Sequence, residues 1–294
     1  MVETVLTPRG RYALELGHFG GRTWNSALPG GEHASARQLI DGRVLIHATS
    51  TAAVEHARFM LAIDDDHSEF VLRFRTDALL GRTVRALPGL RPHRVATVAH
   101  ALLRGICGQL IQSSRARQLE RVILSAAGTR APEQADLARF APVQLRALGL
   151  ATERAAALVR LCRTLDLERL RNVPTEAVAA RLGRERTVGP WTIGVVALAG
   201  LGRWDYGLVG DLGLVKLMSA LRGSWVEPAE TAELLAPYGE WQGLAGAYLL
   251  AGWKRGLVPG ADPDLARLVR NRGRRAAQER PLAVARAGQD PPLQ

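Results

Sequence analysis

The sequence predicts a mainly α-helical protein with a smaller N-terminal α/β (α+β) domain. Three observations support this prediction. Residues 1–90 mix strand-forming segments with helical pieces, whereas residues 91–262 place apolar residues almost only at helical spacing. Residues 263–294 lose that spacing and are rich in Arg, Gln and Pro. We therefore expect an N-terminal domain over 1–90, a helical domain over 91–262 and a basic, disordered tail over 263–294.

The N-terminal region begins with short candidate strands. Residues 11–16 and 43–48 are rich in strand-forming side chains, and turns containing Gly and Pro separate them. From Thr51 the apolar period lengthens and indicates helices. The three acids Asp64, Asp65 and Asp66 resemble a calcium or magnesium cluster, but an acidic helix boundary is the stronger interpretation.

From residue 91 the chain is expected to form a series of helices. A long apolar-faced stretch over 96–113 continues through 114–127. Pro142, Gly149, Pro174 and Gly183 mark where shorter helices begin or end. The remaining helices are expected over 133–140, 143–148, 152–164, 175–182, 191–201, from residue 211 to about 221, 228–235 and 241–252.

Composition narrows the class of protein. The 294 residues carry a formal net charge of +11, and all but two of the 39 basic residues are arginines, which suits a polyanionic partner. Two cysteines, Cys107 and Cys162, cannot supply a four-cysteine zinc site or iron–sulfur cluster. The sequence has no long uncharged apolar run and no secretory signal, so we expect a cytoplasmic protein with no membrane contact.

A glycine-containing hairpin precedes the helix expected over 191–201. Its residues are Thr187-Val188-Gly189-Pro190-Trp191-Thr192. Unpaired amides at the N-terminus of a helix, together with its dipole, favour an anion such as a DNA phosphate. An ordinary turn between helices would use the same residues. Downstream, Asp211 in Val-Gly-Asp-Leu opens the next helix, where it can serve as an N-cap or as a functional carboxylate.

These two motifs together resemble the helix–hairpin–helix DNA glycosylases, especially the 3-methyladenine DNA glycosylase II branch. The resemblance covers residues 91–260 well and the first 90 residues loosely. It implies two helical lobes around a cleft and a bacterial, nucleoid-associated protein that acts as a monomer on damaged double-stranded DNA. The implied activity is hydrolysis of the N-glycosidic bond of alkylated bases in duplex DNA by base flipping, which leaves an abasic site in base excision repair.

The resemblance also assigns roles to single residues. Asp211 would be the catalytic carboxylate that stabilises positive charge on the sugar. Trp191 and Trp241 would form the base pocket with Val195, which stands where members of the branch often place an aromatic residue; this predicts a wider pocket or an altered base preference. Core packing is the alternative for each tryptophan.

Further assignments concern the DNA backbone and the wedge. Cys107-Gly108-Gln109-Leu110-Ile111 resembles the family turn that fills the hole left by the flipped nucleotide, with Leu110 as the wedge and Gln109 as its polar companion. Arg115, Arg117 and the arginines after residue 267 are candidate phosphate contacts. The amides of Thr187, Gly189 and Thr192 would face phosphate, and the carbonyls of Gly183, Glu185 and Val188 could hold a structural monovalent or hard cation.

Two departures from the family pattern leave alternatives open. Thr187 replaces the first glycine of the hairpin, so either the turn is adjusted or Thr187 takes an ordinary backbone conformation. Trp191 stands where strand-cutting members carry a lysine, and neither Lys216 nor Lys254 matches that place, which predicts a monofunctional enzyme that needs no cofactor. The alternatives are a non-catalytic damage-binding protein and a bifunctional glycosylase/lyase for oxidised bases.

Overall fold

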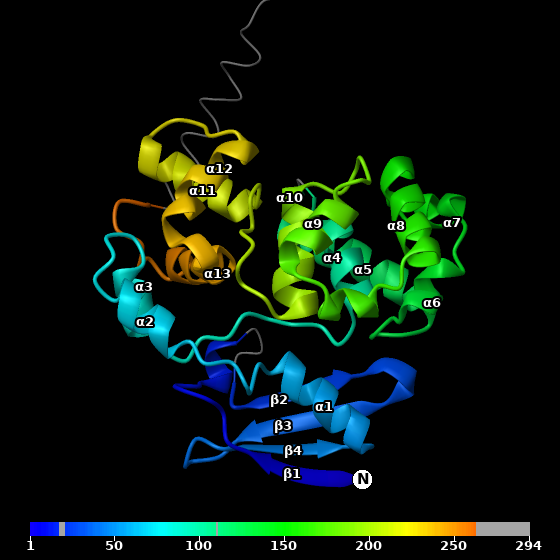
Figure 1. Cartoon of the computed structure of the whole chain (residues 1–294), viewed down its shortest axis with the longest axis horizontal. Coiled ribbons are helices and arrows are strands. Elements are labelled where there is room, and N and C mark those ends of the chain that lie inside the picture. Colours follow the sequence, from blue (N-terminus) through cyan, green and yellow to red (C-terminus); the bar gives the residue numbers. More distant parts are fainter. Residues whose placement is uncertain (18–20, 110, 263–294) are drawn as a thin grey trace, which may run out of the picture.

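The computed structural model describes residues 1–17, 21–109 and 111–262 (Figure 1). It is mainly helical, with one small antiparallel sheet at the N-terminal end, as the sequence predicts. In Figure 1 the sheet lies below two groups of helices that stand side by side above it.

The sheet contains four antiparallel strands in the order β1-β4-β3-β2. Register is fixed by pairs such as Val2 with Ala48 and Ala36 with Ile46. Alternate residues of β4, including Val44 and Ile46, are buried on one face, which is the pattern of a half-covered strand. The strands are β1 (Val2–Leu6), β2 (Thr23–Ala27), β3 (His33–Gln38) and β4 (Val44–Ala48).

Helix α1 (Thr51–Met60) covers the buried face of the sheet. Ser50 caps it, because the side chain of Ser50 accepts a hydrogen bond from the amide of Ala53. The expectation of a strand over 11–16 is wrong, since this segment ends in a short 3-10 turn at Leu14–Leu16. Leu14 is buried in the core. Its amide donates to the side chain of Gln38 and not to a neighbouring strand, so it does not extend the sheet.

The helical part divides into two lobes, visible as the left and right groups in Figure 1. One lobe contains α2 (Ser68–Phe74), α3 (Gly81–Ala86), α11 (Leu212–Arg222), α12 (Thr231–Leu235) and α13 (Gln242–Trp253). The other contains α4 (Val98–Gly108), α5 (Ser113–Ala127), α6 (Gln134–Ala138), α7 (Pro142–Ala147), α8 (Thr152–Thr164), α9 (Thr175–Leu182) and α10 (Pro190–Val195), which continues as a π-helical turn over Val196–Leu201.

The expected continuous stretch from residue 96 to residue 127 is divided in the structure. Helix α4 ends at Gly108, Gln109 has extended backbone angles, and α5 begins only at Ser113 after an extended Gln112. The turn between these helices is part of the segment that the family resemblance assigns to the wedge. Leu110 itself lies outside the described residues, as does the tail over 263–294.

Two hydrophobic clusters form the core. The sheet and α1 form one cluster, which also includes Ile63 and, beyond residue 90, Ala96. The larger cluster begins at Phe70 and spans both helical lobes. The ring of Phe70 lies 5.0 Å from that of Tyr248 on α13. Helices α2 and α3 thus pack with the C-terminal helices, and the domain boundary expected at residue 90 stays a prediction.

Two buried arginines join the sheet domain to the helices. Arg94 donates to Asp65 Oδ2 at 2.5 Å and to the carbonyl of Gly202 at 2.9 Å. Arg91 donates to the carbonyls of Arg9 and Asp65. Asp65 thus serves as an ion-pair partner at a helix boundary, and among the described residues no group of acidic, His or Cys side chains could hold a metal ion.

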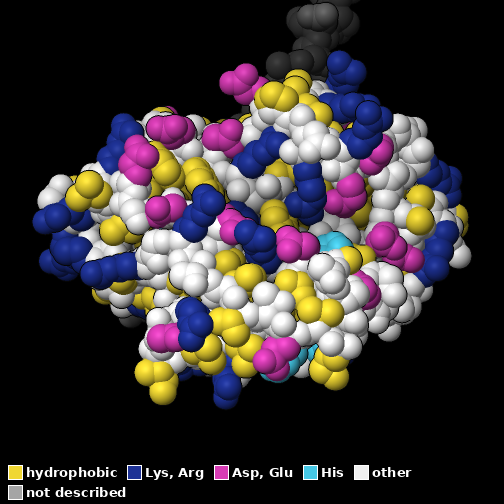
Figure 2. All heavy atoms as spheres, turned by 60° about the horizontal axis from the view of Figure 1, so that its bottom comes forward, with side chains coloured by type: hydrophobic (Ala, Val, Ile, Leu, Met, Phe, Trp, Pro, Cys, Tyr) yellow, Lys and Arg dark blue, Asp and Glu magenta, His cyan; other side chains and the backbone are white. Residues whose placement is uncertain are grey.

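The surface that carries the sheet is mixed in charge. Figure 2 shows basic and acidic side chains interspersed on this face without a continuous basic field. No helix among the described residues is long and apolar enough to span a membrane. The sheet face thus offers no continuous basic surface to a polyanion.

Candidate active site at three helix ends

The hairpin, the turn after α4 and the start of α11 converge at one place. A Cβ placed on Gly210, which precedes Asp211, would lie 3.9 Å from Trp191 Cβ. A Cβ placed on Gly108, at the end of α4, would lie 3.2 Å from the Trp191 ring. Trp191 therefore lies between the end of α4 and the residue that precedes Asp211.

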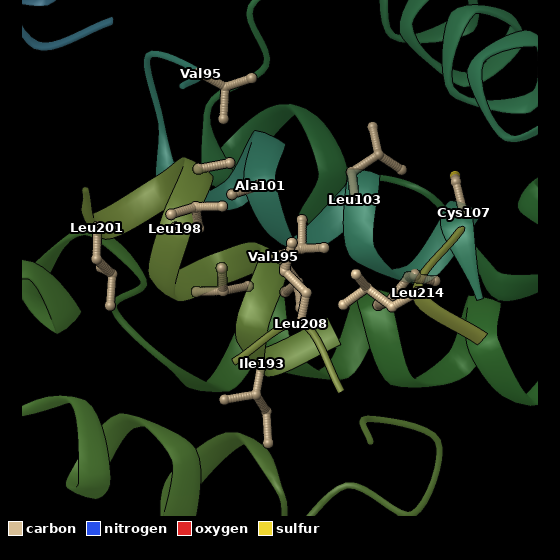
Figure 3. Close-up of a cluster of buried hydrophobic side chains, with 14 of the residues drawn as sticks. Val95, Ala101, Leu103, Cys107, Ile193, Val195, Leu198, Leu201, Leu208 and Leu214 are labelled. Atoms are coloured by element: carbon tan, nitrogen blue, oxygen red, sulfur yellow. The ribbon is translucent and has the colours of Figure 1, made fainter. Parts of the chain in front are cut away.

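Two glycines allow this convergence. A Cβ at Gly105 of α4 would lie 2.9 Å from the Thr192 side chain, and one at Gly194 of α10 would lie 2.5 Å from the carbonyl oxygen of Gly207. Only glycine leaves room for such close approach. Figure 3 shows side chains of α4, α10 and the following segment packed into one cluster, so the helices form a fixed support.

The hairpin presents the start of α10 to solvent. Gly189 is the N-cap and Pro190 occupies the first turn, where its missing N–H costs nothing. Gly189 has an extended backbone with φ −91°, and a Cβ there would meet nothing within 4 Å, so the position faces open space. Thr187 is not among the residues with positive φ. The substitution of glycine by Thr187 is therefore accommodated in an ordinary backbone region.

Gln109 connects the turn after α4 to the hairpin. Its side-chain amide nitrogen donates to the carbonyl of Thr187 at 2.6 Å and to Thr192 Oγ1 at 2.7 Å. The family resemblance makes Gln109 a DNA contact beside the wedge, and that role stays a prediction. The structure adds a positioning role that spacing alone could not reveal, because the bonded residues are 78 and 83 positions away.

We expect Gln109→Leu to loosen the hairpin and weaken DNA binding by about 5- to 150-fold, because it leaves two part-buried acceptors without a donor at a cost of about 1–3 kcal/mol. Gln112→Leu is the matched control, since Gln112 is exposed and makes no side-chain cap bond. Fluorescence-anisotropy titration with a duplex measures both. Equal affinities for the two variants would contradict the positioning role.

Asp211 is the N-cap of α11. Its Oδ1 accepts hydrogen bonds from the amides of Gly213 at 2.7 Å and Leu214 at 3.1 Å. Among the described residues, no hydrogen bond to Oδ2 is found, and the residue is only half-buried. One carboxylate oxygen is thus fixed by the helix, and the other accepts no hydrogen bond within the described part of the chain.

The electrostatic surroundings of Asp211 balance opposing effects. Burial raises the pKa of its carboxyl above the ordinary value, whereas the amide hydrogen bonds and the charges of Lys254 and Lys216 lower that pKa. These are the only lysines in the chain, and both influence this one carboxylate. Lys254 reaches it because α13 packs on α11, where a Cβ at Gly213 would lie 2.5 Å from Leu250.

A raised pKa has a testable consequence for activity. If base release needs ionised Asp211, the rate of release should fall on acidification. The pH at the midpoint of this fall should lie above about 3.9, the pKa of a free aspartate. Lys254→Met should move that midpoint further up, because it removes a charge that favours the carboxylate. Lys254→Arg serves as the control. Single-turnover rates between about pH 4 and 8 measure the midpoint, and equal midpoints for the Met and Arg variants would contradict the expectation.

The candidate pocket residues occupy different surroundings. Trp191 is partly exposed beside Gly210, and its Nε1 has no hydrogen-bond partner among the residues that the structure describes. Trp241 is buried and stacks on Trp204 with ring centroids 5.7 Å apart. Val195 points into the cluster with Leu208 (Figure 3). Only Trp191 is placed next to Asp211 by these contacts, so the roles of Trp241 and Val195 in a pocket stay predictions.

Several charged side chains surround the hairpin. Glu185 forms a bidentate pair with Arg160 at 2.7 Å, and its carbonyl accepts from the amide of Val188. Arg184 and Arg186 are exposed, and no ion pair to them is found within the described part of the chain. Sequence reasoning missed these two arginines although they directly flank the hairpin. Arg115 and Arg117, the candidate phosphate contacts on α5, are also exposed. The cation site on the carbonyls of Gly183, Glu185 and Val188 stays a prediction.

Comparison with solved structures identifies the fold. The structure aligns with a 3-methyladenine DNA glycosylase from Archaeoglobus fulgidus at a TM-score of 0.68 and 18% identity, covering 87% of this chain and 98% of that one. It aligns with the 8-oxoguanine glycosylase/lyase of Clostridium acetobutylicum bound to duplex DNA at 0.66 and 17% identity, covering 83% and 92%. The chain has the fold of the helix–hairpin–helix DNA glycosylases.

In sequence, the chain is 26% identical over 228 residues to a DNA-3-methyladenine glycosylase of Bacillus subtilis, covering 72% of this chain and 75% of the relative. No protein-family model matches the chain. The predicted resemblance is thus confirmed at the level of the fold.

Proposed function

We propose that the protein is a monofunctional DNA glycosylase that hydrolyses the N-glycosidic bond of alkylated bases in duplex DNA and leaves an abasic site. The observation that carries this proposal is the position of Asp211. The first turn of α11 holds one oxygen of its carboxylate, and the residue before it, Gly210, lies next to Trp191 of the hairpin. The sequence relative from Bacillus subtilis favours the alkylated-base branch.

The chemistry follows from this placement. Cleavage of an N-glycosidic bond builds positive charge on the sugar, and a carboxylate beneath the ring stabilises that charge and orients water. Amides of the hairpin hold the strand by a phosphate, and the target nucleotide leaves the stack to reach Asp211. Trp191 offers its aromatic face to an electron-poor alkylated base.

The test is release of the damaged base from matched duplexes. We expect the wild-type protein to release 3-methyladenine or 7-methylguanine and to leave a site that breaks only on treatment with alkali. Release of 8-oxoguanine alone would contradict the preference for alkylated bases. Binding without release of any base would favour the non-catalytic alternative, a protein that recognises damage but does not cut.

The two lysines near Asp211 justify a second test. A primary amine in this place could attack the C1′ aldehyde of the abasic product, and a lyase would then break the strand. Borohydride trapping measures this directly. We expect no covalent adduct with the wild-type protein, because Trp191 occupies the hairpin position. An adduct that disappears in Lys216→Met or Lys254→Met would replace the monofunctional proposal with the bifunctional one.

A further inference from the structure

An exposed indole stands in a well-ordered segment between α11 and α12. Trp225 is 38% exposed, although tryptophan is usually largely buried. Its neighbours are fixed: Gly223 ends α11 in a left-handed conformation, and the buried Val226 donates its amide to Ser219 Oγ at 3.0 Å. The backbone on both sides of the indole is therefore held against α11 by defined contacts.

This segment runs back along α11 toward the candidate site. Pro228 lies 3.7 Å from a Cβ placed on Gly210, and the amide of Gly210 donates to Thr231 Oγ1 at 2.8 Å. Trp225 precedes Pro228 by three residues, which span at most about 11 Å. In Figure 1 the segment forms the upper edge of its lobe, on the same side of the molecule as the hairpin between α9 and α10.

The charges around Trp225 disfavour a phosphate. Arg222 is occupied by Glu230 at 2.7 Å and Glu233 at 2.5 Å. Glu227 is also exposed, so among the described residues acids outnumber bases on this edge. An aromatic ring that has no free cation beside it in the described part of the chain suits the flat face of a nucleobase, since every base can stack through its π-face.

We propose that Trp225 stacks on an unstacked base of the damaged duplex next to the nucleotide held over Asp211. The proposal rests on the proposed glycosylase function, because only an extruded or missing nucleotide frees a base face at this place. An intact duplex offers no such face. Trp225 then contributes to the recognition of opened DNA from the lobe that carries α11 and α12, whereas the hairpin contributes to binding of any duplex.

The experiment compares two duplexes of one sequence, one intact and one with a tetrahydrofuran abasic analogue. Titrations use the full chain as wild type, Trp225→Ala, Trp225→Phe and the control Leu72→Ala, since Leu72 is exposed on α2. We expect Trp225→Ala to raise Kd for the abasic duplex by about 5- to 150-fold and to change Kd for the intact duplex less than about 2-fold. Trp225→Phe should keep most of the affinity, and Leu72→Ala all of it.

Other outcomes overturn the inference. An equal loss on both duplexes would make Trp225 a general DNA contact, and no loss on either would show that Trp225 does not contribute to DNA binding. If either occurs while the wild type still releases alkylated bases, only the role of Trp225 fails. If the wild type neither releases a base nor prefers the abasic duplex, the proposed function fails together with it.

Discussion

Asp211→Asn is expected to lower the single-turnover rate of base release by about 10²- to 10³-fold, the usual effect of removing one electrostatic contact to a transition state. The amide keeps the shape of the side chain but cannot carry the negative charge that the developing sugar cation requires. Asn is also a good N-cap, so the hydrogen bonds to Gly213 and Leu214 can remain.

The stability of this variant separates charge from folding. Because burial raises the pKa of Asp211, the folded protein holds the ionised form at a cost in free energy above that pKa. Asp211→Asn should therefore leave Tm unchanged or raise it. Kinetics with a duplex carrying one alkylated base and thermal unfolding of the same preparation measure both effects. A variant with a wild-type rate would remove Asp211 from the mechanism.

Glu120→Ala is expected to give the largest loss of stability. Glu120 is buried on α5 and accepts hydrogen bonds from His100 at 2.8 Å and Arg104 at 2.9 Å, both on α4. Removing it leaves two donors without their partner, at a cost of about 3 kcal/mol. That corresponds to a drop in Tm of about 6–12 °C for a protein of this size class.

A matched control comes from Glu153, which is exposed in the first turn of α8. Glu153→Ala should change the free energy of unfolding by no more than about 0.5 kcal/mol. Thermal unfolding followed by circular dichroism measures the wild type and both variants. Similar Tm values for the Glu120 and Glu153 variants would show that the buried network contributes little.

The same network predicts how stability depends on pH. Burial alone would raise the pKa of Glu120, but the bonds from His100 and the charge of Arg104 outweigh it and lower that pKa to about 2. An unfolded glutamate has a pKa of about 4.3. The carboxylate therefore stabilises the fold fully above about pH 5, and this stabilisation is lost as the pH falls toward 2. Glu120→Gln should flatten the dependence of Tm on pH in this range.

Much of the helical framework follows from local signals. The bounds of α8 and α9 match the expected ones, since Pro174 precedes α9 and Gly183 follows it. Asp211 was expected to open a helix, and it is the N-cap of α11. Such signals depend on neighbouring residues, which the sequence displays directly.

The features that the sequence did not reveal depend on distant contacts. The break after α4 accompanies the bond from Gln109 to a carbonyl 78 residues away. Phe70 precedes residue 90 but packs on Tyr248 of α13, in the larger cluster. Lys254 influences Asp211 because α13 packs on α11, and nothing near Lys254 in the sequence indicates this.

The most direct test concerns the charge that Asp211 presents to the sugar. Two duplexes are compared, one with a neutral tetrahydrofuran abasic analogue and one with a cationic pyrrolidine analogue that carries positive charge within the ring. We expect the wild-type protein to prefer the cationic analogue by at least about 10-fold, because it resembles the transition state, and Asp211→Asn to lose this preference. An equal preference in both proteins would contradict the placement of this carboxylate beneath the sugar.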